Sequence, residues 1–246
     1  MRDCIIIIPT YNEKENIANI IPYTLNLSDR FEILVIEDGS PDGTATVVKS
    51  LMQQFPDRVH IIERTGKLGL GTAYITGFKW ALDKAKYNYI IEMDADFSHN
   101  PNDVLRLVDA CENKGAGLAV GSRYIKDGAV VNWPVKRLLI SLFGSKYVRI
   151  VTGMRVKDAT AGFVCYTKGT LNKIDLNQIN FVGYAFQIQM KFAVWIQKIN
   201  IIEVPITFKD REVGVSKMSG SIVKEAALGV IRMKLAAKRD KNYLRK

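Results

Sequence analysis

The chain has 246 residues, of which 48% are hydrophobic, and a mean hydropathy of zero; these values indicate one globular domain with a buried core and exclude a disordered chain. Its formal net charge is +10, and residues 232–246 carry seven basic side chains against one acid. A basic end of this kind either attracts anionic lipid or nucleic acid or is simply solvated, and charge alone does not separate these readings.

Short hydrophobic runs alternate with amphipathic stretches along the first half of the chain. Runs typical of strands occupy residues 4–8, 31–36, 59–63, 89–93 and 118–121. Apolar positions with helical spacing occupy residues 13–25, 43–54, 70–84 and 101–114. Continuous runs such as the four isoleucines at 5–8 suit strands that are covered on both faces. The pattern predicts an α/β fold: a single domain with a mostly parallel, Rossmann-like sheet flanked by helices.

Polar segments follow three of the predicted strands, at residues 9–13, 37–44 and 94–96. The carboxyl ends of parallel strands meet at one edge of a sheet, where such folds bind ligands. The last segment is Asp94-Ala95-Asp96, and two carboxylates one residue apart can hold Mg²⁺ or Mn²⁺ against a diphosphate. Such a pair is weak evidence by itself, and the second segment could be a plain turn. Three polar strand ends at one edge nevertheless favour a nucleotide site.

The cysteines and the apolar segments bear on location. Cys4, Cys111 and Cys165 are odd in number, dispersed and set in apolar segments, which favours reduced thiols in a cytosol. The first residues lead directly into a predicted strand, so we expect no signal peptide. The longest apolar stretch, residues 138–144, is far shorter than the roughly 20 residues of a spanning helix. We therefore expect no transmembrane segment.

Seven motifs occur in order between residues 8 and 217. They are IPTYNE (8–13), EDGSPDGT (37–44), GLG (69–71), MDADFSH (93–99), GSRY (121–124), DATAGF (158–163) and REVGVSK (211–217). On these motifs the chain resembles glycosyltransferase family 2, which has the GT-A fold, and within it the dolichyl-phosphate (polyprenyl-phosphate) mannose synthases. The resemblance implies a GT-A catalytic domain over residues 1–217, and we expect residues 218–246 to form an amphipathic, basic C-terminal helix and tail.

The resemblance also implies a donor site. Its nucleotide-sugar contacts would be Pro9, Tyr11, Glu13, Asp38, Asp94, Ala95, Asp96 and Arg123. Carboxylates can accept hydrogen bonds from a base or ribose, and an aromatic ring can pack on a base. Asp94 and Asp96 would bind the metal, Mg²⁺ or Mn²⁺. Ser98 stands at the third metal position, where some relatives have Gln, and Glu37 stands where many relatives have Asp, so these two roles stay open.

The acceptor site must supply positive charge. The chain offers no Ser-His-Asp or Cys-His set, and a phosphate acceptor needs none because its dianion is nucleophilic at neutral pH. The resemblance implies phosphate or diphosphate contacts by Arg123, Arg137, Arg211 and Lys217. It implies an acceptor side built from Asp158, Gly162, Phe163 and Gln187. The implied catalytic set is Asp94, Asp96, Arg123, Arg211 and Lys217.

The function implied by the resemblance is inverting transfer of mannose from GDP-mannose to dolichyl or polyprenyl phosphate, which yields polyprenyl β-mannosyl phosphate and GDP. One alternative is a family 2 enzyme that uses another sugar nucleotide, such as UDP-glucose. A second is a basic peripheral membrane-binding module without turnover. The strand-end acids disfavour that module because they would repel an anionic ligand, and we expect no nucleic acid partner.

A lipid acceptor requires an apolar surface beside the charged site. Residues 133–149 mix large hydrophobic and basic residues as an interfacial helix does. A second apolar stripe, over residues 222–235, has the spacing of a helix that packs on its own domain. We expect a peripheral protein at the cytoplasmic face of a membrane, with contact mainly through the first segment, with or without a membrane protein partner.

Overall fold

The computed structural model describes residues 1–183, 185–210 and 220–246, and the side chains of the last range from residue 227 onward. The strands are β1 (Cys4–Thr10), β2 (Phe31–Glu37), β3 (Val59–Glu63), β4 (Tyr89–Glu92), β5 (Leu118–Ser122), β6 (Ala129–Val131), β7 (Val164–Thr167), β8 (Ile201–Pro205) and β9 (Thr207–Lys209). The helices are α1 (Lys14–Asn26), α2 (Thr44–Gln54), α3 (Leu70–Asp83), α4 (Asp103–Glu112), α5 (Val135–Thr152), α6 (Lys168–Leu171), α7 (Ala185–Ile196) and α8 (Gly220–Arg239), with a 3-10 turn η1 at Leu176–Gln178. Every element predicted for the first half is present, with ends within two residues of the prediction.

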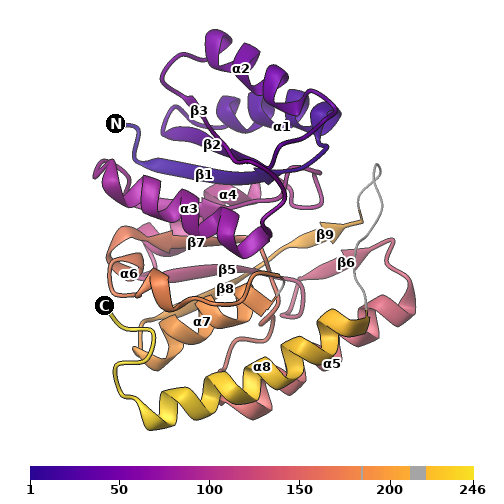
Figure 1. Ribbon diagram of the computed structural model, residues 1–246, viewed down its shortest axis with the longest axis vertical. Coiled ribbons are helices and arrows are strands. Elements are labelled where there is room, and N and C mark those ends of the chain that lie inside the picture. The colour runs from indigo at the N-terminus through magenta and orange to yellow at the C-terminus, as the bar shows by residue number, and fades with distance from the viewer. Residues whose placement is uncertain (184, 211–219) are drawn as a thin grey trace.

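Seven strands form the central sheet in the order β3-β2-β1-β4-β7-β5-β8 (Figure 1). The neighbours β3, β2, β1 and β4 are parallel, as are β5 and β8, whereas β7 runs antiparallel between β4 and β5. The mostly parallel sheet is therefore confirmed, and the antiparallel strand in its middle is an addition to the prediction. A separate two-stranded parallel ribbon pairs β6 with β9.

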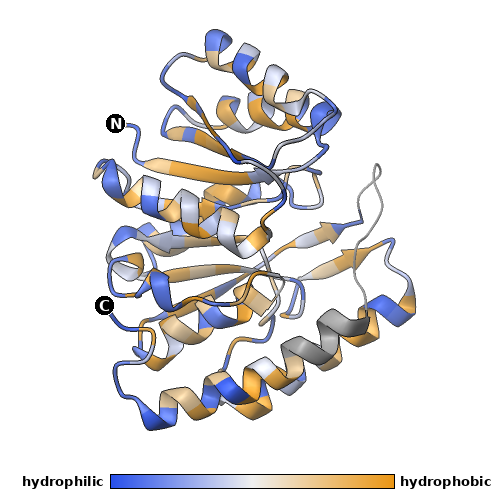
Figure 2. Ribbon diagram, viewed as in Figure 1, coloured by the Kyte–Doolittle hydropathy of each residue, from blue (hydrophilic) through white to orange (hydrophobic). Residues whose placement is uncertain are grey.

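Helices cover both faces of the sheet, as the continuous apolar strands require. Ile5 and Ile7 of β1 join a cluster that includes Phe78 of α3, while Ile6 joins a second cluster with Ile17 of α1. All five side chains are fully buried. Figure 2 shows the central strands as predominantly hydrophobic ribbons between helices of mixed character. Both clusters together hold the strand ends in a fixed arrangement, which positions the polar segments that follow them.

The described part of α8 lies along α5 (Figure 1). The hydroxyl of Tyr147 donates to the carbonyl of Ala227 (2.8 Å), and the ammonium of Lys234 donates to the carbonyl of Thr152 (2.7 Å). The side chain of Met233, in α8, is buried. This part of the basic C-terminal segment is thus packed on the domain. No helix in the described part of the chain combines the length and apolar character needed to span a bilayer.

Candidate active site

The carboxyl ends of the parallel strands meet at one edge of the sheet. Thr10 at the end of β1 pairs with Glu37 at the end of β2. The antiparallel strand β7 starts at this edge, because its first residue, Val164, lies opposite Glu92 at the end of β4. Strands β5 and β8 run parallel to each other and antiparallel to β7, so they also end here. The polar segments after β1, β2 and β4 therefore leave the sheet together, as predicted.

The turn after β4 carries Asp94 and Asp96. The backbone N–H of Asp94 donates to Nδ1 of His99 (3.3 Å), and the backbone N–H of Ser98 donates to Oδ1 of Asp96 (3.0 Å). Because Nδ1 of His99 accepts a hydrogen bond, the ring proton belongs on Nε2. Burial lowers the pKa of His99 to about 4, so the ring is neutral at neutral pH. A neutral imidazole thus helps to hold the acidic turn in shape.

The oxygen atoms of this turn suit a hard divalent cation. Carboxylates such as those of Asp94 and Asp96 are the ligands that Mg²⁺ and Mn²⁺ prefer. The buried hydroxyl of Ser98 has no hydrogen-bond partner among the described residues. Those residues contain no group of three or more His, Cys, Asp and Glu side chains able to enclose a metal. Asp94 and Asp96 are the side chains of this turn that would hold such a cation.

Asp38 is held by an arginine that the sequence did not single out. Nε and one terminal nitrogen of Arg64 donate to the two carboxylate oxygens of Asp38, at 2.6 and 2.7 Å. The other terminal nitrogen of Arg64 donates to the hydroxyl of Thr72 at the start of α3 (2.8 Å). Both side chains of the ion pair are largely buried. Asp38 can thus offer a base or ribose only the lone pairs that Arg64 leaves, in a fixed orientation.

Glu37 shapes the loop beside Asp38. Its carboxylate accepts hydrogen bonds from the backbone N–H groups of Gly39 (3.0 Å) and Ser40 (2.7 Å). The side chain is almost completely buried. Gly39 has a φ of +69°, in the left-handed region that glycine adopts without strain. These contacts give Glu37 a structural role in this loop.

The remaining nucleotide candidates lie after β1 and around the loop before α3. The ammonium of Lys67 lies 5.1 Å from the ring centroid of Tyr11, a cation–π contact. Oε2 of Glu13 accepts a hydrogen bond from the side-chain amide of Asn16 (2.8 Å). Pro9 is partly buried within β1. These contacts place Tyr11 beside Lys67 and Glu13 beside Asn16, and the use of these residues as nucleotide contacts stays a prediction.

Arg123 follows β5 and forms a buried ion pair with Asp158. Two guanidinium nitrogens and the backbone N–H of Arg123 donate to the carboxylate of Asp158, at 2.7, 2.7 and 3.0 Å. Burial would lower the pKa of Arg123, but the hydrogen bonds and charge of Asp158 outweigh it and raise that pKa. Three aromatic rings, of Tyr124, Trp133 and Phe208, surround the guanidinium at 5.0 to 5.5 Å. The charge of Arg123 is therefore fixed in position.

Asp158 departs from the expectation that it faces the acceptor. Its side chain is completely buried, and its carboxylate is paired with Arg123. Its backbone N–H donates to Oε1 of Glu203 (3.0 Å), which also accepts from the hydroxyl of Ser122 (2.7 Å). Oε2 of Glu203 accepts from the backbone N–H of Lys157 (2.8 Å). Glu203 thus anchors the loop and Asp158 anchors Arg123; of these three residues, Arg123 lines the cavity.

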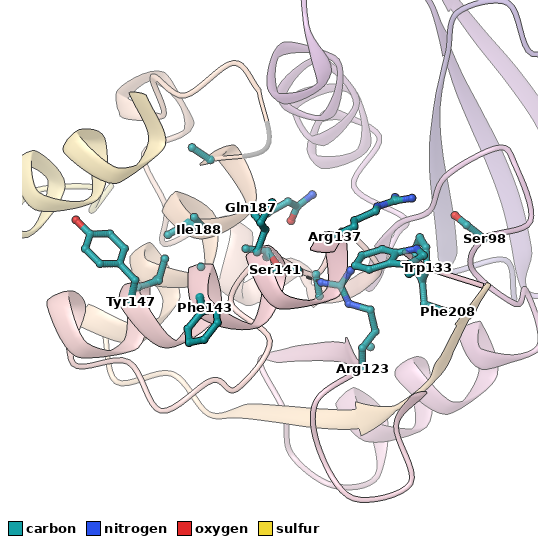
Figure 3. Close-up of a pocket in the computed structure, with 18 of the residues that line it drawn as sticks. Ser98, Arg123, Trp133, Arg137, Ser141, Phe143, Tyr147, Gln187, Ile188 and Phe208 are labelled. Atoms are coloured by element: carbon teal, nitrogen blue, oxygen red, sulfur yellow. Dashed lines mark hydrogen bonds between the residues drawn. The ribbon is translucent and has the colours of Figure 1, made fainter. Parts of the chain in front are cut away.

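Arg137 approaches the same place from the first turn of α5. One of its terminal nitrogens donates to Asp210 (2.8 Å), and its guanidinium carbon lies 4.0 Å from the ring centroid of Trp133. In Figure 3, Arg123 and Arg137 both point toward Trp133. Two of the predicted phosphate-binding arginines are therefore brought together by tertiary structure, although 14 residues separate them in the chain.

A cavity of about 600 Å³ joins these groups to an apolar groove (Figure 3). Asp94, Ser98 and the two arginines line one part of it. Its other part is lined by apolar side chains of α5, α7 and α8, namely Leu139, Ile140, Phe143, Ile188 and Val230. Polar and apolar parts in a single cavity suit a ligand with a charged head and a hydrocarbon tail.

Sequence comparison identifies the family. The family model described as "Glycosyl transferase family 2" matches residues 5–176. The chain belongs to glycosyl transferase family 2. The chain is 44% identical over 237 residues to the polyprenol monophosphomannose synthase of Mycolicibacterium smegmatis, covering 96% of this chain and 89% of that protein. It is 45% identical over 232 residues to the undecaprenyl-phosphate mannosyltransferase of Micrococcus luteus, covering 94% of each.

Solved structures agree on the architecture of this family 2 glycosyltransferase. Glucosyl-3-phosphoglycerate synthase from Mycobacterium tuberculosis, in complex with Mn²⁺, UDP-glucose and phosphoglyceric acid, superposes with a TM-score of 0.68. The match covers 96% of this chain and 79% of that one at 15% identity. The same synthase in complex with phosphoglyceric acid gives a TM-score of 0.66. At this identity the likeness establishes the GT-A fold, as predicted.

Gln187 of this family 2 glycosyltransferase lines the cavity from the first turn of α7. Its side-chain amide donates to the carboxylate of Glu92, the last residue of β4, and both side chains are buried. Burial raises the pKa of Glu92 to about 8. The ammonium of Lys191, also fully buried, donates to the carbonyl of Ala161 (2.5 Å) in the loop that carries Asp158. Gln187 is thus held in place by buried neighbouring side chains.

Two predicted catalytic residues of the glycosyltransferase, Arg211 and Lys217, lie outside the described residues. Three residues support the site in ways that sequence reasoning did not predict: Arg64, Trp133 and Glu203. Arg64 and Glu203 act through residues 26 and 45 positions away, and Trp133 acts by stacking against two arginines, so no motif in the sequence reveals these roles. The strongest available signal was the position of Arg64 directly after the third predicted strand.

Proposed function

We propose that this enzyme transfers mannose, with inversion, from GDP-mannose to a dolichyl or polyprenyl phosphate, and releases GDP. The observation that carries the proposal is the single cavity that joins the acidic turn, two arginines and an apolar groove. A sugar nucleotide alone would not require that groove. The names of the relatives from M. smegmatis and M. luteus support a polyprenyl phosphate acceptor and mannose transfer.

The reaction needs no general base in this arrangement. An oxygen of the acceptor phosphate forms a bond to the anomeric carbon of mannose, while the bond between that carbon and the GDP oxygen breaks on the opposite face. The phosphate carries no proton that must be removed for attack, because its second pKa is near 6. Arg123 and Arg137 would hold the acceptor phosphate against the repulsion of the donor diphosphate, and their geometry is set before the ligand arrives.

Asp94 and Asp96 would hold the metal, for which we propose Mg²⁺ or Mn²⁺. Once bound, that ion neutralises the charge that develops on the departing diphosphate. The double change Asp94→Asn and Asp96→Asn should abolish transfer while leaving the fold intact by circular dichroism. Activity that survives this change would point to a peripheral binding protein or to another catalytic centre. Nucleotide binding measured by calorimetry with and without Mg²⁺ distinguishes loss of the metal site from loss of the fold.

The substrates can be assigned by a direct assay. Purified protein with GDP-mannose, Mg²⁺ and dolichyl or undecaprenyl phosphate should yield a lipid-linked mannose that mild acid releases. Replacing GDP-mannose by UDP-glucose tests the alternative donor, and competition by GDP against UDP measures the preference for the base. Absence of product with every polyprenyl phosphate tested would overturn the proposal.

We also propose that α5 contacts a membrane surface. Val135, Phe143 and Ile150 recur at intervals of eight and seven residues, so they share one face of the helix. Their side chains are 71%, 64% and 73% exposed. Basic residues accompany this face at Lys136, Lys146 and Arg149. Because α5 also lines the cavity, a lipid tail could pass from the bilayer to the site along the same helix.

Vesicle binding tests this surface. The double change Phe143→Ser and Ile150→Ser should weaken co-sedimentation with vesicles that contain anionic lipid. Leu105→Ser is a matched control, because Leu105 is also an exposed hydrophobic residue but belongs to α4, which packs on the opposite face of the sheet. Equal binding by the wild type and the double variant would contradict the assignment.

We place the enzyme at the cytoplasmic face because its three cysteines are free thiols.

A further inference from the structure

Trp133 contacts both arginines of the cavity. Its ring centroid lies 4.0 Å from the guanidinium carbon of Arg137 and 5.3 Å from that of Arg123. Both distances fall within the range in which a cation is attracted to the face of an indole, the aromatic ring that attracts cations most strongly. Figure 3 shows the three side chains gathered at the polar end of the cavity. One uncharged side chain therefore links two groups of like charge.

Two guanidinium groups repel each other, so their approach needs compensation. Arg123 has a buried carboxylate partner in Asp158, whereas the partner of Arg137, Asp210, is about a quarter exposed and the ion pair is correspondingly screened. The contact with Trp133 adds attraction without adding negative charge to the cavity. Additional carboxylates would have cancelled the positive potential that a phosphate requires. The indole preserves that potential while it fixes the arginines.

The position of Trp133 is itself fixed by the small ribbon of β6 and β9. Trp133 follows β6 closely, and Phe208 lies within β9. The two rings meet edge to face, with centroids 5.3 Å apart. Phe208 also lies 5.5 Å from the guanidinium carbon of Arg123. The ribbon thus supports an aromatic wall whose face is already in place against both arginines.

Two polar atoms at this wall have no hydrogen-bond partner in the described part of the chain. Nε of Arg137 and Nε1 of Trp133 are buried N–H donors, and neither has a hydrogen-bond acceptor among the described residues. Buried donors of this kind cost free energy unless an acceptor arrives. An oxyanion has several acceptor lone pairs. After a small movement of the Arg137 side chain, an oxygen of such an anion could accept a hydrogen bond from these donors. The local chemistry therefore favours a phosphate group.

We infer that Trp133 is a positioning residue that sets the spacing of the Arg123 and Arg137 guanidinium groups for the phosphate of the acceptor. This inference rests on the proposed function, because it names the residue that prepares the acceptor site of that reaction. Removal of the indole frees Arg137 to rotate toward solvent. The acceptor phosphate would then have to order the arginine during binding, which weakens its affinity.

Steady-state kinetics with Trp133→Leu and Trp133→Phe test the inference. The leucine variant should raise the KM for polyprenyl phosphate on the order of ten-fold, as expected for the loss of two cation–π contacts. Its KM for GDP-mannose and its metal requirement should stay within about two-fold of the wild type. The phenylalanine variant keeps an aromatic face and should recover most of the loss. Trp195→Phe is the control, because Trp195 does not line this cavity.

The outcomes separate positioning from a general structural role. A rise in the donor KM, or a fall in kcat with an unchanged acceptor KM, would overturn the inference. So would equal defects in the leucine and phenylalanine variants. Thermal unfolding of each variant shows whether it is folded, and the phenylalanine variant keeps the test decisive if the leucine variant is unstable.

Tryptophan fluorescence measures ligand binding independently of catalytic turnover. The chain has three tryptophans, Trp80, Trp133 and Trp195, so the double change Trp80→Phe and Trp195→Phe leaves Trp133 as the sole indole. Farnesyl phosphate should change its emission, farnesol should not, and inorganic phosphate should act only at higher concentration. An unchanged emission with farnesyl phosphate would refute the positioning role. A clear change in a protein that transfers no mannose would instead leave this inference standing and refute the proposed function.

Discussion

The buried ion pair between Arg123 and Asp158 makes a quantitative prediction. The change Asp158→Asn keeps the shape of the side chain but removes its charge and replaces one acceptor oxygen by an NH₂ donor. In the wild type, three N–H groups of Arg123 donate hydrogen bonds to this carboxylate, at 2.7 to 3.0 Å. At least one of them would face another donor in the variant. The guanidinium would remain buried without a counterion.

The expected loss of stability follows from burial. The side chain of Asp158 is fully buried and that of Arg123 is 8% exposed, and removing one partner of such a pair typically costs about 3–5 kcal/mol. The exposed pair of Lys49 and Glu63, at 2.8 Å, provides a matched control. Its loss through Glu63→Gln should cost less than about 1 kcal/mol because solvent screens both charges.

Urea unfolding measures both effects. For a slope of about 2–3 kcal/mol per M, the midpoint of Asp158→Asn should fall by roughly 1–2.5 M, while Glu63→Gln should hardly move it. Replacing both partners, by Arg123→Met with Asp158→Leu, should restore most of the stability but no activity, because the uncompensated charge is gone. Equal midpoints for Asp158→Asn and Glu63→Gln would refute the reasoning.

Acidification tests the same pair independently. Burial would raise the pKa of Asp158, but the hydrogen bonds and charge of Arg123 outweigh it and lower that pKa. A lowered folded-state pKa means that the stabilisation is complete above the usual value of about 3.8 and is lost as the pH falls below it. The difference between the wild type and Asp158→Asn should therefore be constant from pH 7 to pH 5 and shrink only below about pH 4.

Other consequences concern the rest of the domain. Burial would raise the pKa of Glu32, but hydrogen bonds from His60, Lys86 and Tyr87 outweigh it and lower the pKa to about 2. Glu32→Gln should therefore lower the free energy of unfolding, measured with urea at pH 7, by roughly 2 kcal/mol. The difference in stability between the wild type and this variant should narrow as the pH falls below about 4.5. A Cβ at Gly71 would lie 2.5 Å from the carbonyl oxygen of Phe181 and 3.0 Å from Cβ of Phe186, so Gly71→Ala should lower the melting temperature despite the better helix propensity of alanine. Gly144→Ala is the control, because a Cβ there meets nothing within 4 Å, and it should raise the stability by up to about 1 kcal/mol. A loss of stability in Gly144→Ala as large as that in Gly71→Ala would show that backbone effects, and not the clash, dominate.

The acidic turn shows how far sequence reasoning reaches into the site. Asp94 and Asp96 follow a hydrophobic run that is long enough to mark a strand, and parallel strands end at one edge, so their meeting with residues 9–13 and 37–44 was predictable. Ser98 was left open, and its unpartnered hydroxyl beside the turn still leaves it a candidate ligand. The support of Asp94 by His99 was not predicted, because a backbone N–H bonded to an imidazole leaves no trace in composition or spacing.

The partners of the charged residues were less accessible. Asp158 was expected to face the acceptor, but it is buried under Arg123, 35 positions earlier in the chain. Arg64 binds Asp38 across 26 positions, and Glu203 anchors the loop of Asp158 across 45. A motif records which residue types are present, and it does not record which of them pair in space. An acid in a motif can therefore serve either a ligand or another side chain.

The sequence alone determined the alternation of strands and helices in the first half, the edge at which the polar segments meet, and the family, because hydrophobic periodicity and strand-end motifs are local properties of the chain. Only the tertiary structure decided that β7 enters the sheet antiparallel between β4 and β5, that Asp158 supports Arg123, and that Trp133 brings Arg123 and Arg137 together. These features depend on long-range packing and on the balance between burial and charge, which a chain settles only when distant segments fold against one another.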